Sequence, residues 1–136
     1  EFTFALWVRS AVQQASALYS RPFEGATSVE NTFQIYVGTP AYWKIEVNRN
    51  GSGKDAEMDV WHHLAGAFDG TTLVTYLDGA QFDTILPGAV QYSADGVLIG
   101  CDIDLGSEMF HYTGLVDDVR LYDHPLRADE IAALAI

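Results

Sequence analysis

The chain has 136 residues, and its 19 acidic against 7 basic side chains give a formal net charge of −12. One domain is expected from this length, and the negative charge excludes nucleic acid or an anionic membrane surface as a partner, because phosphate binding needs clustered cations. Apolar residues, at 49%, suffice for a packed core, but their runs are too short to span a bilayer, and the single cysteine, Cys101, excludes an intramolecular disulfide.

From its N-terminus the chain alternates apolar with other side chains at a period of two, which is typical of β-strands. The alternation is clear over residues 2–9, 42–47 and 73–78. Turn sequences such as Asn50-Gly51, Asp69-Gly70 and Asp78-Gly79 separate these runs at short intervals. Because glycine supplies the positive φ of tight hairpin turns, this pattern favours a β-sandwich or barrel.

Residues 61–84 form the clearest predicted meander, with strands over 61–68, 73–78 and 81–84. Large apolar side chains occupy both faces of the first strand, so we expect it at the centre of a sheet covered on both sides. The polar stretch 48–59 is predicted to be an exposed loop. A helix is predicted only at the C-terminus, over 127–134, where Ile131 and Leu134 lie on one face.

Three motifs follow one another along the chain: FTFALWV at 2–8, WHHLA at 61–65 with YLDG at 76–79, and GLVDDVRLY at 114–122 followed by Glu130-Ile131. In this order they resemble the laminin-G-like, or concanavalin A-like lectin/glucanase, jelly-roll family. The resemblance implies an all-β fold, a two-sheet antiparallel β-sandwich with one short C-terminal helix, as a single domain over 1–136. It also implies a secreted or cell-surface protein, whose relatives often bind glycans and often hold a structural calcium ion.

Two features depart from the family pattern. Family members usually have a further strand before the FT segment, whereas this chain starts at Glu1-Phe2 without Met. We therefore expect a domain excised from a longer protein, with an unpaired sheet edge that invites self-association or a partner strand. The serine usual at the helix start is Arg127 here, and the loss of its capping hydroxyl costs about 1 kcal/mol.

Asp117 is the candidate metal ligand. By strand parity it shares a face with Leu115 and Val119, which looks like the core side, where an ionised carboxylate is costly unless paired. Calcium prefers oxygen ligands, and the resemblance points the same way, since the family often holds calcium near this DDV motif. The alternative is a β-bulge that turns Asp117 outward, or pairing with arginine or backbone N–H groups. Asp102-x-Asp104 resembles the opening of a calcium loop, but it lacks the distal Glu of an EF-hand, and we interpret it as a solvated acidic loop.

Catalysis is not expected. Glucanases of the same fold use a Glu-x-Asp-x-(x)-Glu strand, whose carboxylates act as nucleophile and acid. Glu57-x-Asp59 begins this pattern, but Trp61 and His62 stand where the second Glu would be. His62 and His63 are adjacent on a strand, so they point to opposite faces and cannot share one metal ion.

Glycan binding needs aromatic faces that stack on sugar rings, and amides or carboxylates that bond their hydroxyls. Exposed tyrosines and the acidic loop are the candidates, with Asn31 near them, although ordinary sheet packing is the alternative for each aromatic. The predicted ligand-binding residues are Tyr36, Tyr42, Tyr92, Asp102, Asp104 and Tyr112.

These observations predict a non-catalytic, lectin-like carbohydrate-binding module of a secreted or cell-surface protein, with a glycan or polysaccharide as its partner, a structural Ca²⁺ ion and no insertion into a membrane. The alternative is a structural or adhesion module that binds a protein partner or self-associates through the exposed sheet edge.

Overall fold

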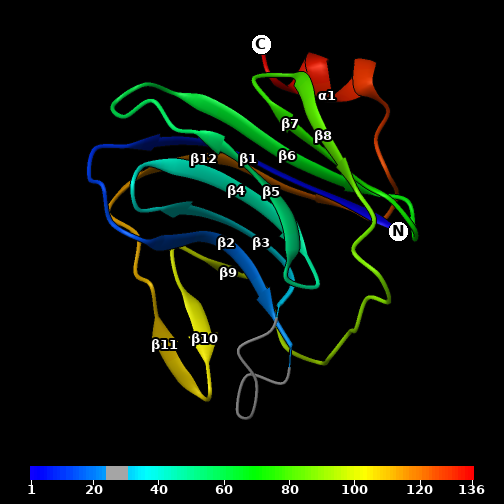
Figure 1. Ribbon diagram of the computed structural model, residues 1–136, viewed down its shortest axis with the longest axis horizontal. Coiled ribbons are helices and arrows are strands. Elements are labelled where there is room, and N and C mark those ends of the chain that lie inside the picture. The colour runs from blue at the N-terminus through cyan, green and yellow to red at the C-terminus, as the bar shows by residue number, and fades with distance from the viewer. Residues whose placement is uncertain (24–30) are drawn as a thin grey trace.

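The computed structural model describes residues 1–23 and 31–136 and shows two antiparallel sheets stacked face to face (Figure 1). In the first sheet the strands run in the order β12 (Gly114–Tyr122), β1 (Phe2–Ser10), β6 (His62–Phe68), β7 (Leu73–Leu77) and β8 (Ala80–Ile85). In the second the order is β5 (Asn50–Asp55), β4 (Tyr42–Val47), β3 (Asn31–Gly38), β2 (Ser16–Pro22) and β9 (Leu98–Ile99).

A separate hairpin of β10 (Asp102–Asp104) and β11 (Ser107–Met109) lies beside the second sheet, and the helix α1 (Ala128–Leu134) lies beside the first (Figure 1). The predicted all-β sandwich with one short C-terminal helix is therefore confirmed. Within residues 1–23 and 31–136, no helix has the length and apolar character needed to cross a bilayer.

The main core lies between the two sheets and is built from alternate residues of each strand. Phe4 of β1 stacks on Phe33 of β3 with ring centroids 4.5 Å apart, and both side chains are buried. Gly66 of β6 makes this contact possible, because a Cβ there would lie 2.6 Å from the Phe4 ring and 2.9 Å from the Ile45 side chain. A close-packed interior leaves no room for such an atom.

The predicted meander is confirmed, and β6 lies between β1 and β7 with every residue buried. Asp78 and Gly79 both have positive φ, as a two-residue hairpin turn requires. The Asp78 carboxylate also ties the turn to β6, since it accepts the His63 N–H at 2.8 Å and bonds His62 Nδ1 at 2.8 Å. The WHH and DG motifs therefore act together to hold the turn after β7 against β6.

The two histidines point to opposite faces of β6, as expected. The His62 ring contacts Trp43 of the main core, and the His63 ring contacts Trp7 on the other face. On that second face a small core of Ala5, Ala65, Ala67 and Tyr76 packs against the buried Ile131 of α1.

The helix begins after Arg127. The Arg127 backbone N–H donates to the Glu130 carboxylate at 2.8 Å, so that half of the capping arrangement survives without the serine.

The loop prediction for residues 48–59 is wrong over 50–55, which form β5 and pair with β4 along its whole length. Asn48 and Arg49 both have positive φ and make a two-residue turn between the strands. Gly51 allows the strands to approach, because a Cβ there would lie 2.2 Å from the Ile45 carbonyl oxygen. The polar composition is that of an edge strand, which exposes most of its side chains to solvent.

Candidate functional site

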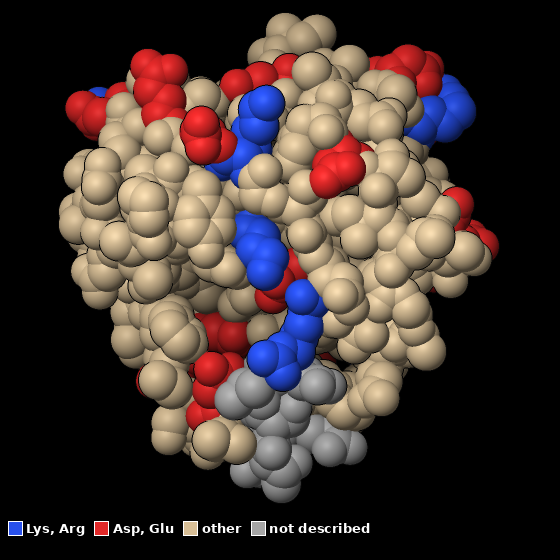
Figure 2. Space-filling view, in the orientation of Figure 1, with Lys and Arg blue, Asp and Glu red and all other residues tan. Residues whose placement is uncertain are grey.

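A cavity of about 630 Å³ opens on the face of the second sheet that points away from the core. Figure 2 shows acidic side chains deep in a hollow on this side of the molecule, with basic side chains along its rim. The cavity is lined by Ala15, Ser16, Ala17, Asn31, Gln34, Tyr36, Gly38, Thr39, Tyr42, Lys44, Glu46, Arg49, Asp102, Asp104 and Phe110.

Strand parity explains why β3 and β4 supply the floor of this cavity. Phe33, Ile35 and Val37 of β3 point into the core, so the residues between them point into the cavity. The same alternation holds in β4, and the antiparallel register places Tyr36 opposite Lys44. The polar positions of two apolar strands therefore form one continuous surface.

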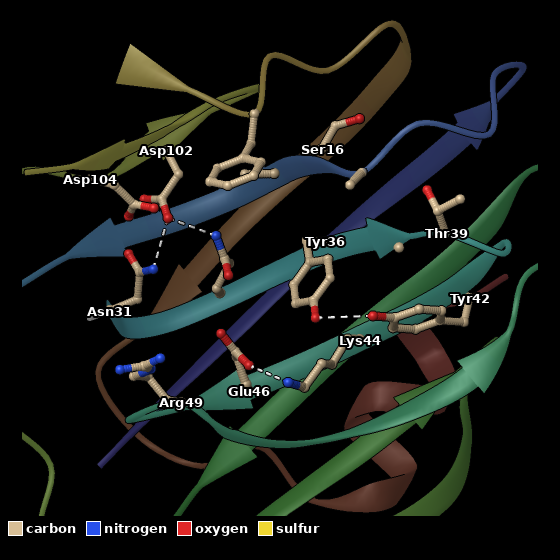
Figure 3. Close-up of a pocket in the computed structure, with 15 residues that line it drawn as sticks. Ser16, Asn31, Tyr36, Thr39, Tyr42, Lys44, Glu46, Arg49, Asp102 and Asp104 are labelled. Atoms are coloured by element: carbon tan, nitrogen blue, oxygen red, sulfur yellow. Dashed lines mark hydrogen bonds and ion pairs between the residues drawn. The ribbon is translucent and has the colours of Figure 1, made fainter. Parts of the chain in front are cut away.

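One end of the cavity is aromatic (Figure 3). The Tyr36 and Tyr42 hydroxyl oxygens lie 3.2 Å apart, and their rings meet edge to face at 6.0 Å. Burial and the bond to Tyr42 raise the pKa of Tyr36, which keeps its hydroxyl neutral. Lys44 Nζ lies 5.5 Å from the Tyr36 ring centroid and 2.9 Å from Glu46 Oε2. A Cβ on Gly38 would lie 2.1 Å from the Tyr42 ring, so this glycine is what admits that ring.

The other end of the cavity is acidic (Figure 3). Asp102 is 2% exposed, and its Oδ2 accepts hydrogen bonds from Asn31 Nδ2 at 2.8 Å and from Gln34 Nε2 at 2.9 Å. Its Oδ1 accepts the Ile103 backbone N–H at 2.9 Å. Asn31 and Asp104 each bury an Oδ1 atom that has no hydrogen-bond partner in the described part of the chain. Burial, followed by the nearby Asp102, raises the pKa of Asp104.

Four of the six predicted ligand-binding residues, Tyr36, Tyr42, Asp102 and Asp104, line this one cavity. Tyr92 lies in a separate hollow, where its ring meets Phe2 edge to face at 6.4 Å. Tyr112 packs against the core and donates its O–H to the Arg9 carbonyl at 2.8 Å. The structure thus groups four of the six, and their role in binding stays a prediction.

Several lining residues were not among the sequence candidates. Gln34, Lys44 and Glu46 carry a signal that could have found them, because they alternate with the apolar residues of β3 and β4. Phe110, which is 42% exposed, follows β11 and has a positive φ. No strand pattern marks Phe110, since its place depends on how the β10–β11 hairpin packs.

The placement of Asp117 on the core side is wrong. Trp7 of β1 pairs with Asp117, but Ala5 pairs with Arg120, so β12 carries one extra residue in a β-bulge at Asp118, where φ is +48°. Because of this extra residue, the alternation of faces along β12 does not continue across the bulge. Asp117 is therefore exposed, whereas Val119 packs against the core.

The surroundings of Asp117 do not fit a calcium site. Its Oδ1 accepts the Asp118 backbone N–H at 2.7 Å, and the Asp118 carboxylate is held by two bonds from the Arg120 guanidinium at 2.8 and 2.9 Å. Calcium takes about 6–8 oxygen ligands. Across residues 1–23 and 31–136, however, no group of three His, Cys, Asp or Glu side chains is arranged to hold a metal. A calcium ion, and Asp117 as one of its ligands, both stay predictions.

The incomplete glucanase pair lies outside the cavity, because neither Glu57 nor Asp59 lines it. Asp59 is instead paired with Arg9 at 2.8 Å. The arrangement gives these carboxylates no shared substrate surface with the tyrosines.

Comparison with known proteins agrees with the two-sheet fold. A laminin-G family model described as the Concanavalin A-like lectin/glucanases superfamily matches residues 1–132. The chain belongs to this superfamily. A comparison with curated proteins finds no match.

Solved structures of the same fold have low sequence identity to this chain. The CBM40 module of the Ruminococcus gnavus IT-sialidase, bound to α2,3-sialyllactose, is 15% identical with a TM-score of 0.77, over 99% of this chain and 82% of that one. A SAP-like pentraxin of Limulus polyphemus is 19% identical with a TM-score of 0.72, over 99% and 69%. A Trypanosoma rangeli sialidase mutant with trans-sialidase activity is 19% identical with a TM-score of 0.77, but only 22% of its chain is covered. At these identities the likeness shows the fold.

Proposed function

We propose that this chain is a non-catalytic carbohydrate-binding module that holds a glycan in the cavity of the second sheet. The observation that carries the proposal is the pairing of two tyrosines at one end with unpartnered amide and carboxylate oxygens at the other. A sugar has both an apolar ring face and a rim of hydroxyl groups, and it needs both kinds of contact. The cavity volume of about 630 Å³ falls within the range of roughly 300–1,000 Å³ typical of small-ligand sites.

Similarity to the Ruminococcus gnavus module supports this proposal, because that protein has the same fold and is bound to a sugar. The same comparison supports a binding role rather than catalysis, because that structure is the CBM40 module of a sialidase bound to a sugar. The family resemblance further supports a secreted or cell-surface protein as the setting of the module.

The test is a glycan array followed by titration of each retained glycan. Tyr42→Ala is expected to weaken binding about tenfold, since it removes one stacking surface and one hydrogen bond. Tyr92→Ala is the matched control, because Tyr92 is 53% exposed and lies outside the cavity. Thermal unfolding of both variants checks that each is folded.

If both tyrosine variants weaken glycan binding equally, the glycan binds outside this cavity. If the array retains no glycan, the proposal is wrong. A dimer in size-exclusion chromatography without glycan retention would favour the alternative of self-association.

A further inference from the structure

Resting on the proposed function, we infer that the acidic end of the cavity selects sugars that present hydrogen-bond donors, namely neutral and amino sugars, and rejects sugars that carry a carboxylate. The inference concerns the chemical class of the ligand. It depends on two buried oxygen atoms, Asn31 Oδ1 and Asp104 Oδ1, and on the charges around them.

The Asn31 side chain has only one favourable orientation. Its Nδ2 donates to Asp102 Oδ2 at 2.8 Å, and flipping the amide would turn its oxygen toward that carboxylate. Asn31 is 4% exposed, and its Oδ1 has no hydrogen-bond partner among residues 1–23 and 31–136. A buried acceptor without a donor is costly, so a hydroxyl or ammonium group of a ligand would satisfy it.

Asp104 supplies a second acceptor in the same cavity. Its Oδ1 is likewise buried and without a partner in the described chain, and both residues line the cavity. Two acceptors in one cavity match two donors on one sugar, such as two hydroxyls or a hydroxyl and an amine. A ligand carboxylate has only acceptor atoms at neutral pH, so it can satisfy neither oxygen.

The charges in the cavity act in the same direction. Glu46, Asp102 and Asp104 line it together with Lys44 and Arg49, and Lys44 is paired with Glu46 at 2.9 Å. Besides burial, the charge of Asp102 raises the pKa of Asp104 by more than the charge of Arg49 lowers it, so the negative neighbour acts on Asp104 more strongly than the positive one. The chain as a whole carries a net charge of −12, which repels anionic ligands at longer range.

Sialyllactose, the ligand of the Ruminococcus gnavus module, carries a carboxylate. The present cavity would therefore use the same fold for a different class of sugar. The two proteins are 15% identical, which is compatible with such a change, because proteins can share a fold while the side chains that line their cavities differ.

The experiment uses matched methyl glycosides of the gluco, galacto and manno series, each as the neutral sugar, the 2-amino sugar and the uronic acid. Titrations are followed by NMR on the whole chain at neutral pH. Within the series that binds, the neutral and amino sugars are expected to bind on the order of tenfold more tightly than the uronic acid, since a charge-assisted bond is replaced by repulsion.

Asp104→Asn keeps the size of the side chain and removes its charge. This variant is expected to weaken binding of the amino sugar relative to the neutral sugar, and to reduce the difference in affinity between the neutral sugar and the uronic acid. Asp129→Asn on α1 removes one exposed charge outside the cavity and is expected to change neither ratio.

Preferred binding of a uronic acid, or of sialyllactose, in the cavity overturns the inference and leaves the proposed function intact. Failure of every methyl glycoside to shift the cavity amides, while an array retains the protein, also overturns the inference alone. Failure of both experiments removes the proposed function together with the inference.

Discussion

Replacing Asp102 by alanine is expected to destabilise the fold, whereas the same change two residues later at Asp104 is not. Asp102 is 2% exposed and receives three hydrogen bonds of 2.8, 2.9 and 2.9 Å, from Asn31, Gln34 and Ile103. Its loss leaves all three donors without their acceptor. A hydrogen bond to a charged group contributes about 1.5–3 kcal/mol, but the contributions are not additive and water from the cavity can reach some of the donors. We expect a loss of roughly 2–4 kcal/mol.

At Asp104, in contrast to Asp102, the cost of burying the carboxylate is not offset by hydrogen bonds in the folded protein. Its Oδ1 is buried without a partner in the described residues, and burial raises its pKa. Removing it relieves a desolvated acceptor, so Asp104→Ala is expected to leave the free energy of unfolding unchanged or to raise it by no more than about 1 kcal/mol. This variant should lose glycan affinity at the same time, as is common where a binding site is maintained at the expense of stability.

The assay is equilibrium unfolding in urea for the wild type, Asp102→Ala, Asp102→Asn and Asp104→Ala. Asparagine retains one acceptor oxygen, so Asp102→Asn should lose about half as much stability as the alanine variant. The reasoning is refuted if Asp102→Ala changes the free energy of unfolding by less than about 0.5 kcal/mol, or if both alanine variants lose the same amount.

Burial lowers the pKa of His63, so the neutral ring is favoured in the fold and the free energy of unfolding should fall as the pH drops below roughly 6.5. In His63→Phe the free energy of unfolding should depend less on pH between about pH 5 and 7. An unchanged pH dependence would contradict the assignment of this effect to His63. Gly38→Ala should displace the overlying Tyr42 ring and weaken glycan binding about tenfold with little change in melting temperature, which titration and thermal unfolding measure together. Chelation by EDTA should lower the melting temperature if a structural calcium ion is present, and Asp117→Asn should leave that response unchanged, because Asp117 lacks the surroundings of a calcium site.

The sequence by itself determined most of the strands and the class of fold. Alternation at a period of two is a property of neighbouring residues, and so is the positive φ that Asp78 and Gly79 supply to their turn. The placement of Tyr36 and Tyr42 on the face away from the core followed from the same alternation. The polar strand β5 was missed, because its pairing with β4 depends on an approach at Gly51 that composition does not reveal.

Only the tertiary structure decided which polar residues meet. Asn31 and Asp102 are 71 positions apart and share a hydrogen bond because β10 packs against β2, the neighbour of β3 in the second sheet. The bulge at Asp118 reversed the face of Asp117, since one inserted residue changes the direction of the side chains that precede it. Local chemistry sets the strands and their faces, whereas the packing of distant strands sets the contacts that create the cavity.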